Sequence, residues 1–214
     1  MTLVIGVVSQ KGGVGKSTCA RLIAREYAKA GWDVKIADLD ISQGTSFDWH
    51  QRRLQHDFKP VLAVERFGSV EQALRTGTYH DLLVLDGAPH STAATLKIVN
   101  ASAVAVLPSG LSLEDLKPQV LLAHELVKKG TARKKIIFAL CRVGDSDSLH
   151  VSARDYIKQA GYAVLDESLP EKLTYLRAAE EGRAVTETKL PMLNVRAARM
   201  AQGVIDLAAK LEKK

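Results

Sequence analysis

The chain has 214 residues, and its 30 Lys and Arg against 24 Asp and Glu give a formal charge of +6. Its 25% charged and 46% hydrophobic residues are typical of a globular protein and exclude a disordered chain. Aromatic residues make up only 5%, which disfavours a base-stacking surface for single-stranded nucleic acid. The positive charge alone is compatible with a nucleic-acid partner, an anionic surface or simple solubility.

Apolar runs and amphipathic segments alternate along the chain. The apolar runs are continuous, which is typical of a parallel sheet covered on both faces. We therefore predict a single α/β domain over residues 1–214, with a doubly wound, mainly parallel sheet and helices on both faces. In chain order we expect a strand at 3–9, a helix at 16–30, a strand at 34–38, a helix at 46–55, a strand at 61–64, a helix at 69–75, strands at 82–86 and 103–108, a helix at 114–129, a strand at 135–141, a helix at 152–160, a strand at 163–165, and helices at 172–181 and 195–211.

The N-terminal residues predict a cytoplasmic protein. They carry neither the basic segment nor the cleavage site of a signal peptide, and no apolar run reaches the roughly 18 residues of a membrane span. Because the first predicted strand starts at residue 3, we expect no separate N-terminal DNA-binding domain. Cys19 and Cys141 lie far apart in the sequence without metal-site spacing, so we expect two buried, reduced thiols.

The segment QKGGVGKST at residues 10–18 lies between the first predicted strand and the first predicted helix. Its end fits the phosphate-loop pattern G-x-x-x-x-G-K-[ST], although Gln10 stands where the pattern has its first glycine. Its glycines would let backbone N–H groups point at phosphate oxygens, and the helix N-terminus would add its dipole. Lys16 would contact the β- and γ-phosphates, and the Ser17 hydroxyl would bind Mg²⁺. The alternative is a glycine-rich turn with no ligand. The predicted nucleotide-binding residues of this loop are Lys11, Gly12, Gly13, Val14, Gly15, Lys16, Ser17 and Thr18.

Three aspartates lie at or just after the carboxyl ends of two predicted strands, and so at the same edge of the sheet. Asp38 and Asp40 are two residues apart in an extended segment, so both point to one side. One of them could help to hold Mg²⁺, and the other could orient an attacking water. Asp86 ends the apolar run LLVLD, which is typical of a strand whose terminal carboxylate holds a Mg²⁺-bound water. The alternative for Asp38 and Asp40 is that they cap the following helix.

Lys11, at the start of KGGVGKST, resembles the deviant Walker A lysine of the ParA/MinD family of ATPases, most like the small ParA-type plasmid partition proteins. The resemblance implies ATP and Mg²⁺ as cofactors and a nucleotide-sandwich dimer in which Lys11 contacts the partner's phosphates. ADLDISQG resembles the family's D-x-D-P-Q segment, which implies that Asp40 positions the hydrolytic water and that Asp38 lies near the metal. The proline of that segment is absent here, and the spacing from Asp40 to Trp49 is one residue longer. The catalytic residues would be Lys11, Lys16 and Asp40, and the metal residues Ser17, Asp38 and Asp86.

The resemblance extends to the other side of the nucleotide. Residues 87–89 resemble the family's second switch, and we assign no role to the neighbouring His90. The residue after the strand at 135–141 would contact the adenine, and a short turn with a proline would cover the base. The family usually has arginine after that proline, whereas this chain has glutamate. These nucleoside contacts are expected from Arg142, Leu169, Pro170 and Glu171.

Basic residues gather in two regions of the sequence. The cluster at 128–135 is expected to be a solvated face at the amino end of the sheet. The resemblance implies non-specific DNA contacts where the final helix begins, and the alternative there is ordinary surface charge. That helix is expected to pack on the core rather than to anchor a membrane. The predicted DNA-contacting residues are Lys189, Arg196 and Arg199.

The function that the resemblance implies is a slow ATPase stimulated by a ParB-like partner. It would form a homodimer on ATP, bind DNA non-specifically, associate with the nucleoid, and drive the segregation of plasmid or chromosomal DNA. Three alternatives stay open. They are the same engine positioning another cargo, such as a protein assembly or conjugation machinery; a metabolic ligase or synthetase of the same branch; and an adaptor that binds nucleotide without hydrolysing it.

Overall fold

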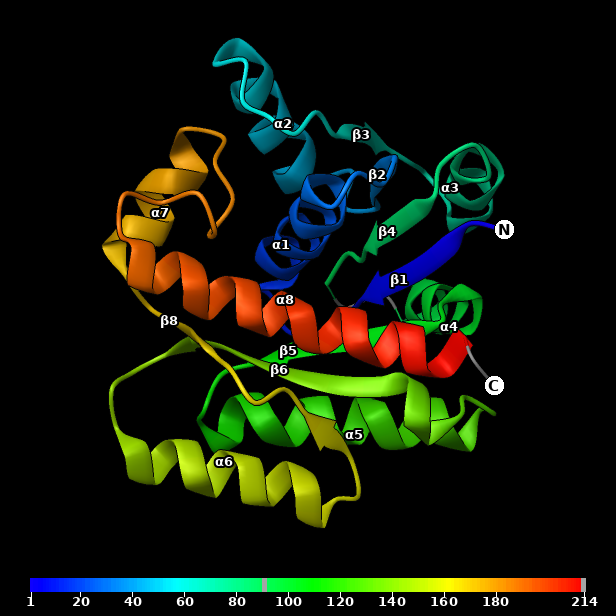
Figure 1. Cartoon of the computed structure of the whole chain (residues 1–214). Coiled ribbons are helices and arrows are strands. Elements are labelled where there is room, and N and C mark those ends of the chain that lie inside the picture. The colour runs from blue at the N-terminus through cyan, green and yellow to red at the C-terminus, as the bar shows by residue number, and fades with distance from the viewer. Residues whose placement is uncertain (90–91, 213–214) are drawn as a thin grey trace.

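A parallel sheet with the strand order β3-β2-β4-β1-β5-β6-β7 runs through the molecule, and the short β8 pairs with β6 beside it (Figure 1). The computed structural model describes residues 1–89 and 92–212, so His90 lies outside the described residues. The strand pairs of the described residues are all parallel, which confirms the predicted fold class. The strands are β1 (Leu3–Val7), β2 (Val34–Asp38), β3 (Ala63–Arg66), β4 (Leu82–Asp86), β5 (Val104–Ser109), β6 (Ile136–Val143), β7 (Ala163–Val164) and β8 (Leu169–Pro170).

Alternate residues of the central strands pack on opposite sides of the sheet. In β4, Leu82 and Val84 belong to one hydrophobic cluster, whereas Leu83 and Leu85 belong to the other. All four side chains are buried, which explains why the sequence shows a continuous apolar run.

Helices cover both faces. The first cluster joins the sheet to α1 and α8, which lie side by side (Figure 1), while the second joins it to α3, α4, α5 and α6. None of the helices in the described residues is long and apolar enough to cross a bilayer. The helices are α1 (Lys16–Lys29), α2 (Thr45–Gln55), α3 (Val70–Gly77), α4 (Thr92–Ala101), α5 (Leu113–Lys128), α6 (Asp147–Gln159), α7 (Leu173–Glu180) and α8 (Pro191–Glu212), with a 3₁₀ turn η1 (Arg133–Lys135) before β6.

Several elements differ from the sequence prediction. Helix α4 was not predicted, and the segment at 169–170 forms a strand rather than a simple turn. Helices α6 and α8 begin five and four residues earlier than expected, at Asp147 and Pro191. Strand β3 begins at Ala63 instead of residue 61. The two cysteines are buried as expected, although the fold brings their sulfur atoms within 3.4 Å of each other.

Candidate functional site

The loop between β1 and α1 has the backbone that its glycines permit. Gly13 and Gly15 have φ angles of 74° and 100°, in the left-handed region that glycine favours. A Cβ atom on Gly15 would also lie 3.0 Å from the Cβ of Cys141 on β6. A side chain at residue 15 would therefore both strain the backbone and displace the loop from the sheet.

Lys16 follows this loop directly and is the first residue of α1. Its side chain is only 8% exposed, and its Nζ donates to the carbonyl oxygen of Lys11, 3.1 Å away. Burial lowers the pKa of its ammonium group, and the carboxylates of Asp86 and Asp40 oppose that shift. A cavity of about 220 Å³ opens beside it, with residues 12, 13 and 15–18 of the loop and α1 on one wall and Asp40 on another. A cation held at a helix N-terminus in a small cavity is suited to binding phosphate.

Two of the three predicted aspartates are buried beneath this cavity. Asp38 accepts hydrogen bonds from the backbone N–H groups of Ser46 and Phe47 at 2.9 and 3.0 Å, in the first turn of α2. Asp38 therefore caps the first turn of α2, as the alternative interpretation of this residue predicted. Asp86 accepts from the hydroxyl of Ser46 at 2.7 Å through Oδ2, while its buried Oδ1 has no hydrogen-bond partner within residues 1–89 and 92–212.

Asp40 lies at the cavity itself, at the start of a tight turn. Its Oδ1 accepts from the Ser42 hydroxyl at 2.7 Å and from the Gln43 amide at 3.1 Å. The backbone N–H of Gly44 bonds to the Asp40 carbonyl at 2.7 Å, which closes the turn immediately before α2. The turn thus accommodates the longer spacing without a proline, and Asp40 and Gln43 both line the phosphate cavity.

We predict that Asp86→Asn stabilises the ligand-free protein at pH 7. Burial raises the pKa of Asp86 to about 6; the Ser46 hydroxyl opposes this shift and the charge of Asp38 adds to it. A carboxyl group with a higher pKa in the folded state lowers the free energy of unfolding as pH rises between its unfolded and folded pKa values. Asparagine removes that penalty, so urea denaturation should show a gain of about 1–3 kcal/mol at pH 7 and none below about pH 4.

The control for this measurement is Asp48→Asn, which removes an exposed ion pair with Arg66 and should change stability by less than about 1 kcal/mol. An Asp86→Asn protein that is equally or less stable at pH 7 would contradict the assigned burial penalty. The same variant is expected to lose Mg²⁺-dependent hydrolysis, because the amide cannot replace the carboxylate toward a cation.

Lys11 points away from its own phosphate cavity. Its Nζ pairs with Asp115 Oδ1 at 2.5 Å and lies 3.4 Å from the carbonyl oxygen of Glu114, both in the first turn of α5. The Lys11 side chain is 45% exposed, so its ammonium group is at the rim of the site. No local pattern in the sequence predicts the contact with Asp115, because the two residues are 104 positions apart.

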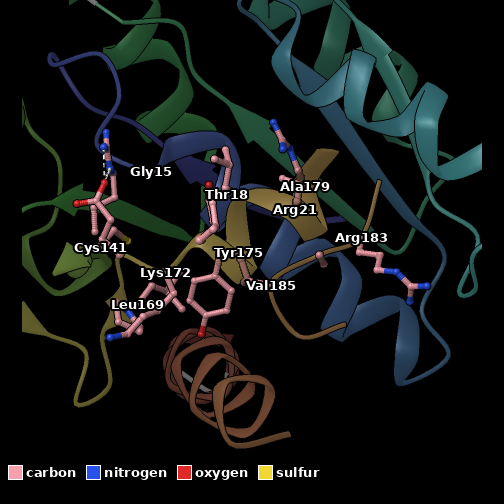
Figure 2. A pocket seen from close by; sticks show the side chains of 16 residues that line it. Gly15, Thr18, Arg21, Cys141, Leu169, Lys172, Tyr175, Ala179, Arg183 and Val185 are labelled. Carbon is pink, nitrogen blue, oxygen red and sulfur yellow. Dashed lines mark hydrogen bonds and ion pairs between the residues drawn. The ribbon is translucent and has the colours of Figure 1, made fainter. Parts of the chain in front are cut away.

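A larger cavity of about 560 Å³ adjoins the phosphate loop. Figure 2 shows Gly15 and Thr18 on one side of it, Cys141 and Leu169 on another, and Tyr175 and Val185 beyond them. Its walls are mostly apolar side chains from β6, β8, α7 and the segment after α7. The predicted nucleoside residues all line this cavity; they are Arg142, Leu169, Pro170 and Glu171.

The sequence predicted that Arg142 follows the strand at 135–141. Arg142 instead lies within β6, which continues to Val143. The strand is irregular at this residue: Arg142 has a φ of 54°, and the pairing with β8 shifts register between Cys141 and Val143. The guanidinium donates to the carbonyl oxygen of Gly13 at 2.9 Å and twice to Glu171 Oε1, at 2.6 and 3.1 Å. Arg142 therefore ties the phosphate loop to the segment that walls the larger cavity.

The three residues predicted to contact DNA lie close together in the sequence but differ in their contacts. Arg196 donates to the Ser168 carbonyl and hydroxyl at 2.8 and 2.7 Å. Glu167 lies 3.6 Å from Arg196 and 3.7 Å from Arg199, which reduces the positive field there. Lys189 and Arg199 are exposed. The basic cluster at 128–135 lies at the start of β6, at the amino end of the sheet, as predicted.

The residues that the structure adds to the site are Arg21 and Ser46. Arg21 lies on α1 four residues after Ser17, a spacing that places both on one helix face. This spacing was a usable sequence signal, although a lone arginine on a helix is usually exposed. Nothing in the sequence marked Ser46, whose hydroxyl bonds to Asp86.

The donors around this site fit a magnesium–nucleotide. Asp86 Oδ1 is buried and has no partner among the residues that the structure describes, so it provides the carboxylate oxygen that Mg²⁺ and its waters prefer. The Ser17 hydroxyl lies close enough to lower the Asp86 pKa. The left-handed glycines leave room for phosphate oxygens, and Lys16 supplies positive charge. Fold and site together define a phosphate-loop nucleotide-binding protein.

Comparison with known proteins supports this class of protein. The CobQ/CobB/MinD/ParA nucleotide binding domain matches residues 5–185, and the chain belongs to this family. The predicted ParA/MinD family membership is confirmed, and so are ATP and Mg²⁺ as the cofactors at the level of the family.

Among related sequences, the maintenance of carboxysome distribution protein A of Gloeobacter kilaueensis is 30% identical over 190 residues, which are 86% of this chain and 84% of that protein. The iron-sulfur cluster carrier protein of Clostridium perfringens is 54% identical over 39 residues, which are 18% of this chain and only 14% of that protein.

Two solved structures share the fold over nearly the whole chain. The MinD protein of Pyrococcus horikoshii, complexed with Mg-ADP, has a TM-score of 0.76 at 19% identity and covers 100% of both chains. The pNOB8 ParA protein bound to nonspecific DNA has a TM-score of 0.69 at 13% identity, over 98% of this chain and 99% of that one.

Proposed function

We propose that this chain is a ParA-type ATPase that pairs with a second copy of itself on ATP and segregates DNA. The observation that most supports the proposal is the position of Lys11. A lysine that served only its own phosphate loop would point inward like Lys16, whereas the ammonium of Lys11 is at the rim and half exposed. From there it can contact phosphates bound by a facing copy.

The residues of the site have distinct roles in this proposal. The metal, when bound, neutralises charge on the phosphates of ATP. The N–H groups of residues 12–18 and the Lys16 ammonium bind those phosphates, and Ser17 and Asp86 face the metal. Asp40 orients the attacking water from its turn at the cavity wall. The segment at 169–171 and Arg142 enclose the nucleoside.

Lys11 has to leave Asp115 before it can reach a partner. Because the pair is exposed to solvent, breaking it costs at most about 1 kcal/mol. Contacts to the partner's phosphates are charge-assisted hydrogen bonds in a closed interface, and each is worth more than that. Dimerisation is therefore expected to release the Lys11–Asp115 pair rather than to be prevented by it.

DNA binding in this proposal uses positive charge without reading bases. Lys189 and Arg199 are exposed beside α8, and the neighbouring Arg196 adds charge that Glu167 partly offsets. A single face of this kind binds weakly, and two copies in a dimer would double its phosphate contacts. The nonspecific DNA in the pNOB8 ParA structure supports this expectation. A ParB-like partner would stimulate slow hydrolysis, and the ATP-bound dimer would associate with the nucleoid.

The second candidate is the same engine with a protein assembly as its cargo. The Gloeobacter kilaueensis relative, a carboxysome distribution protein, favours it, because the alignment covers most of both chains. Both candidates use the same nucleotide-dependent dimer and DNA contacts. They differ only in the partner that links the ATPase to its cargo.

ATP hydrolysis and DNA binding by the purified protein test the proposal. ATP with Mg²⁺ should convert the wild type to a dimer in sedimentation, and the dimer should bind random-sequence DNA with an affinity that falls steeply as salt rises. Lys11→Ala should bind ATP within a few-fold of wild type yet form no dimer and bind no DNA. The control is Lys97→Ala, which removes another exposed lysine that pairs with a carboxylate, that of Glu71.

Other outcomes separate the alternatives. Hydrolysis that requires a small carboxylate substrate and ignores DNA would support the ligase. ATP binding with no turnover under any condition would support the adaptor. A Lys11→Ala protein that still dimerises on ATP would contradict the role of Lys11 in the proposal.

A further inference from the structure

Arg21 is a buried cation that none of the roles above uses. It lies on α1 and is only 6% exposed, yet it lines both the phosphate cavity and the larger cavity beside it. Burying a charged side chain this deeply has a large desolvation cost, which hydrogen-bond partners must offset.

Those partners lie in the first turn of α2, and one of them leads on to Asp86. Arg21 Nε donates to the Ser46 hydroxyl oxygen at 3.2 Å, and Nη2 donates to the Thr45 carbonyl at 2.8 Å. The same Ser46 hydroxyl donates to Asp86 Oδ2 at 2.7 Å. A continuous chain of hydrogen bonds thus joins α1, the first turn of α2 and the end of β4.

The geometry suits arginine and no other cation. The planar guanidinium presents two N–H donors at a fixed angle, so it can hold a carbonyl and a hydroxyl oxygen at once. The ring of Trp49 packs against the guanidinium, with its centroid 5.4 Å from Cζ, and limits its movement. A lysine at this position has a single nitrogen and could not reproduce both bonds with the same direction.

We propose that Arg21 is a positioning residue for the magnesium–nucleotide reaction. Through Ser46 it fixes the Asp86 carboxylate, so that Oδ1 is the oxygen left for the metal. Through Thr45 it holds the end of the turn that begins at Asp40. One side chain therefore fixes both the Asp86 carboxylate and the turn that begins at Asp40. This inference rests on the proposed function, because it takes the site to bind Mg²⁺ with ATP.

The inference predicts a loss that depends on the metal. In titrations with a fluorescent N-methylanthraniloyl derivative of ATP, Arg21→Lys and Ser46→Ala should each reduce the affinity gained on adding Mg²⁺ by about tenfold. The affinity measured in EDTA, which depends on the phosphate loop, should change less than about twofold. Since both residues act in one chain, the double variant should lose no more than the worse single variant.

The matched control is Arg25→Lys, one turn further along α1, where the side chain pairs with Glu26 and Glu187 instead of the first turn of α2. It should leave the Mg²⁺-dependent gain unchanged. The inference would be overturned if the variants lost the same affinity with and without Mg²⁺, or if the losses added in the double variant. It would also be overturned if Arg21→Lys bound the nucleotide as Arg25→Lys does. Ser46→Ala removes only the hydroxyl oxygen and is expected to fold. It therefore still tests the inference if Arg21→Lys folds poorly. A wild type that binds no nucleotide in either condition would instead overturn the proposed function.

Discussion

Replacing Lys16 with alanine is expected to lower the affinity for Mg-ATP by about 100-fold or more. Lys16 is a buried cation that lines the phosphate cavity, where its ammonium can make charge-assisted hydrogen bonds that each contribute about 1.5–3 kcal/mol. A loss of that size corresponds to one or two factors of ten per bond. Isothermal titration calorimetry with Mg-ATP measures the effect directly.

The control for this experiment is Lys29→Ala, an exposed lysine in the last turn of the same helix. It should bind Mg-ATP as the wild type does. Circular dichroism of both variants separates loss of binding from loss of fold. A folded Lys16→Ala protein with wild-type affinity would show that the phosphate loop does not hold the nucleotide in the expected way.

Glu187→Gln is expected to destabilise the protein by about 3 kcal/mol, because it leaves the buried Arg53 guanidinium without its counter-charge. The Arg53 side chain is 2% exposed, and its Nη1 and Nη2 donate to the two Glu187 oxygens at 2.6 and 3.0 Å. The Ala184 amide also donates to Glu187, at 2.8 Å. Urea denaturation at pH 7 provides the measurement.

The same glutamate predicts how stability depends on pH. Burial alone would raise the Glu187 pKa, but hydrogen bonds from Arg53 and Ala184 hold that pKa below its ordinary value. A carboxyl group with a lowered folded pKa stabilises the fold above its unfolded pKa, and this contribution is lost as pH falls through the folded pKa. The advantage of the wild type over Glu187→Gln should therefore shrink below about pH 4.

Glu181→Gln is the matched control, because Glu181 also pairs with an arginine but at the exposed surface. It should change the free energy of unfolding by less than about 1 kcal/mol. If the two glutamine variants were equally stable, the Arg53–Glu187 pair would contribute no more than a surface ion pair.

The sequence predicted the central strands well because their burial on both faces leaves unbroken apolar runs. It failed at α4, whose segment TAATLKIVNA contains β-branched residues and asparagine, which are weak helix formers. Packing of Ile98 and Val99 against the sheet fixes that helix, and packing is not local information. The end of β6 was misplaced for a related reason: nothing in IIFALCRV signals the irregular pairing at Arg142.

The candidate site also has a part that local sequence patterns predict and a part that they do not. The phosphate loop could be predicted because its residues are contiguous and their spacing is itself the signal. The roles assigned to Lys11, Asp40 and Asp86 remain predictions, although the structure places Asp40 at the phosphate cavity and Asp86 just beneath it. The contacts of Lys11 with Asp115 and of Arg21 with Ser46 join segments that are distant in the chain. A single sequence carries no local pattern for such pairs.

The surroundings of Trp49 give the protein an optical signal of its own. This indole is fully buried on α2, has the guanidinium groups of Arg21 and Arg53 against its ring, and donates from Nε1 to the Arg183 carbonyl at 3.0 Å. Since α2 follows directly from the turn at Asp40, any shift of that turn changes the field around the indole. Trp32, the second tryptophan of the chain, can be replaced by phenylalanine. Fluorescence emission then follows α2 in real time, without an attached dye.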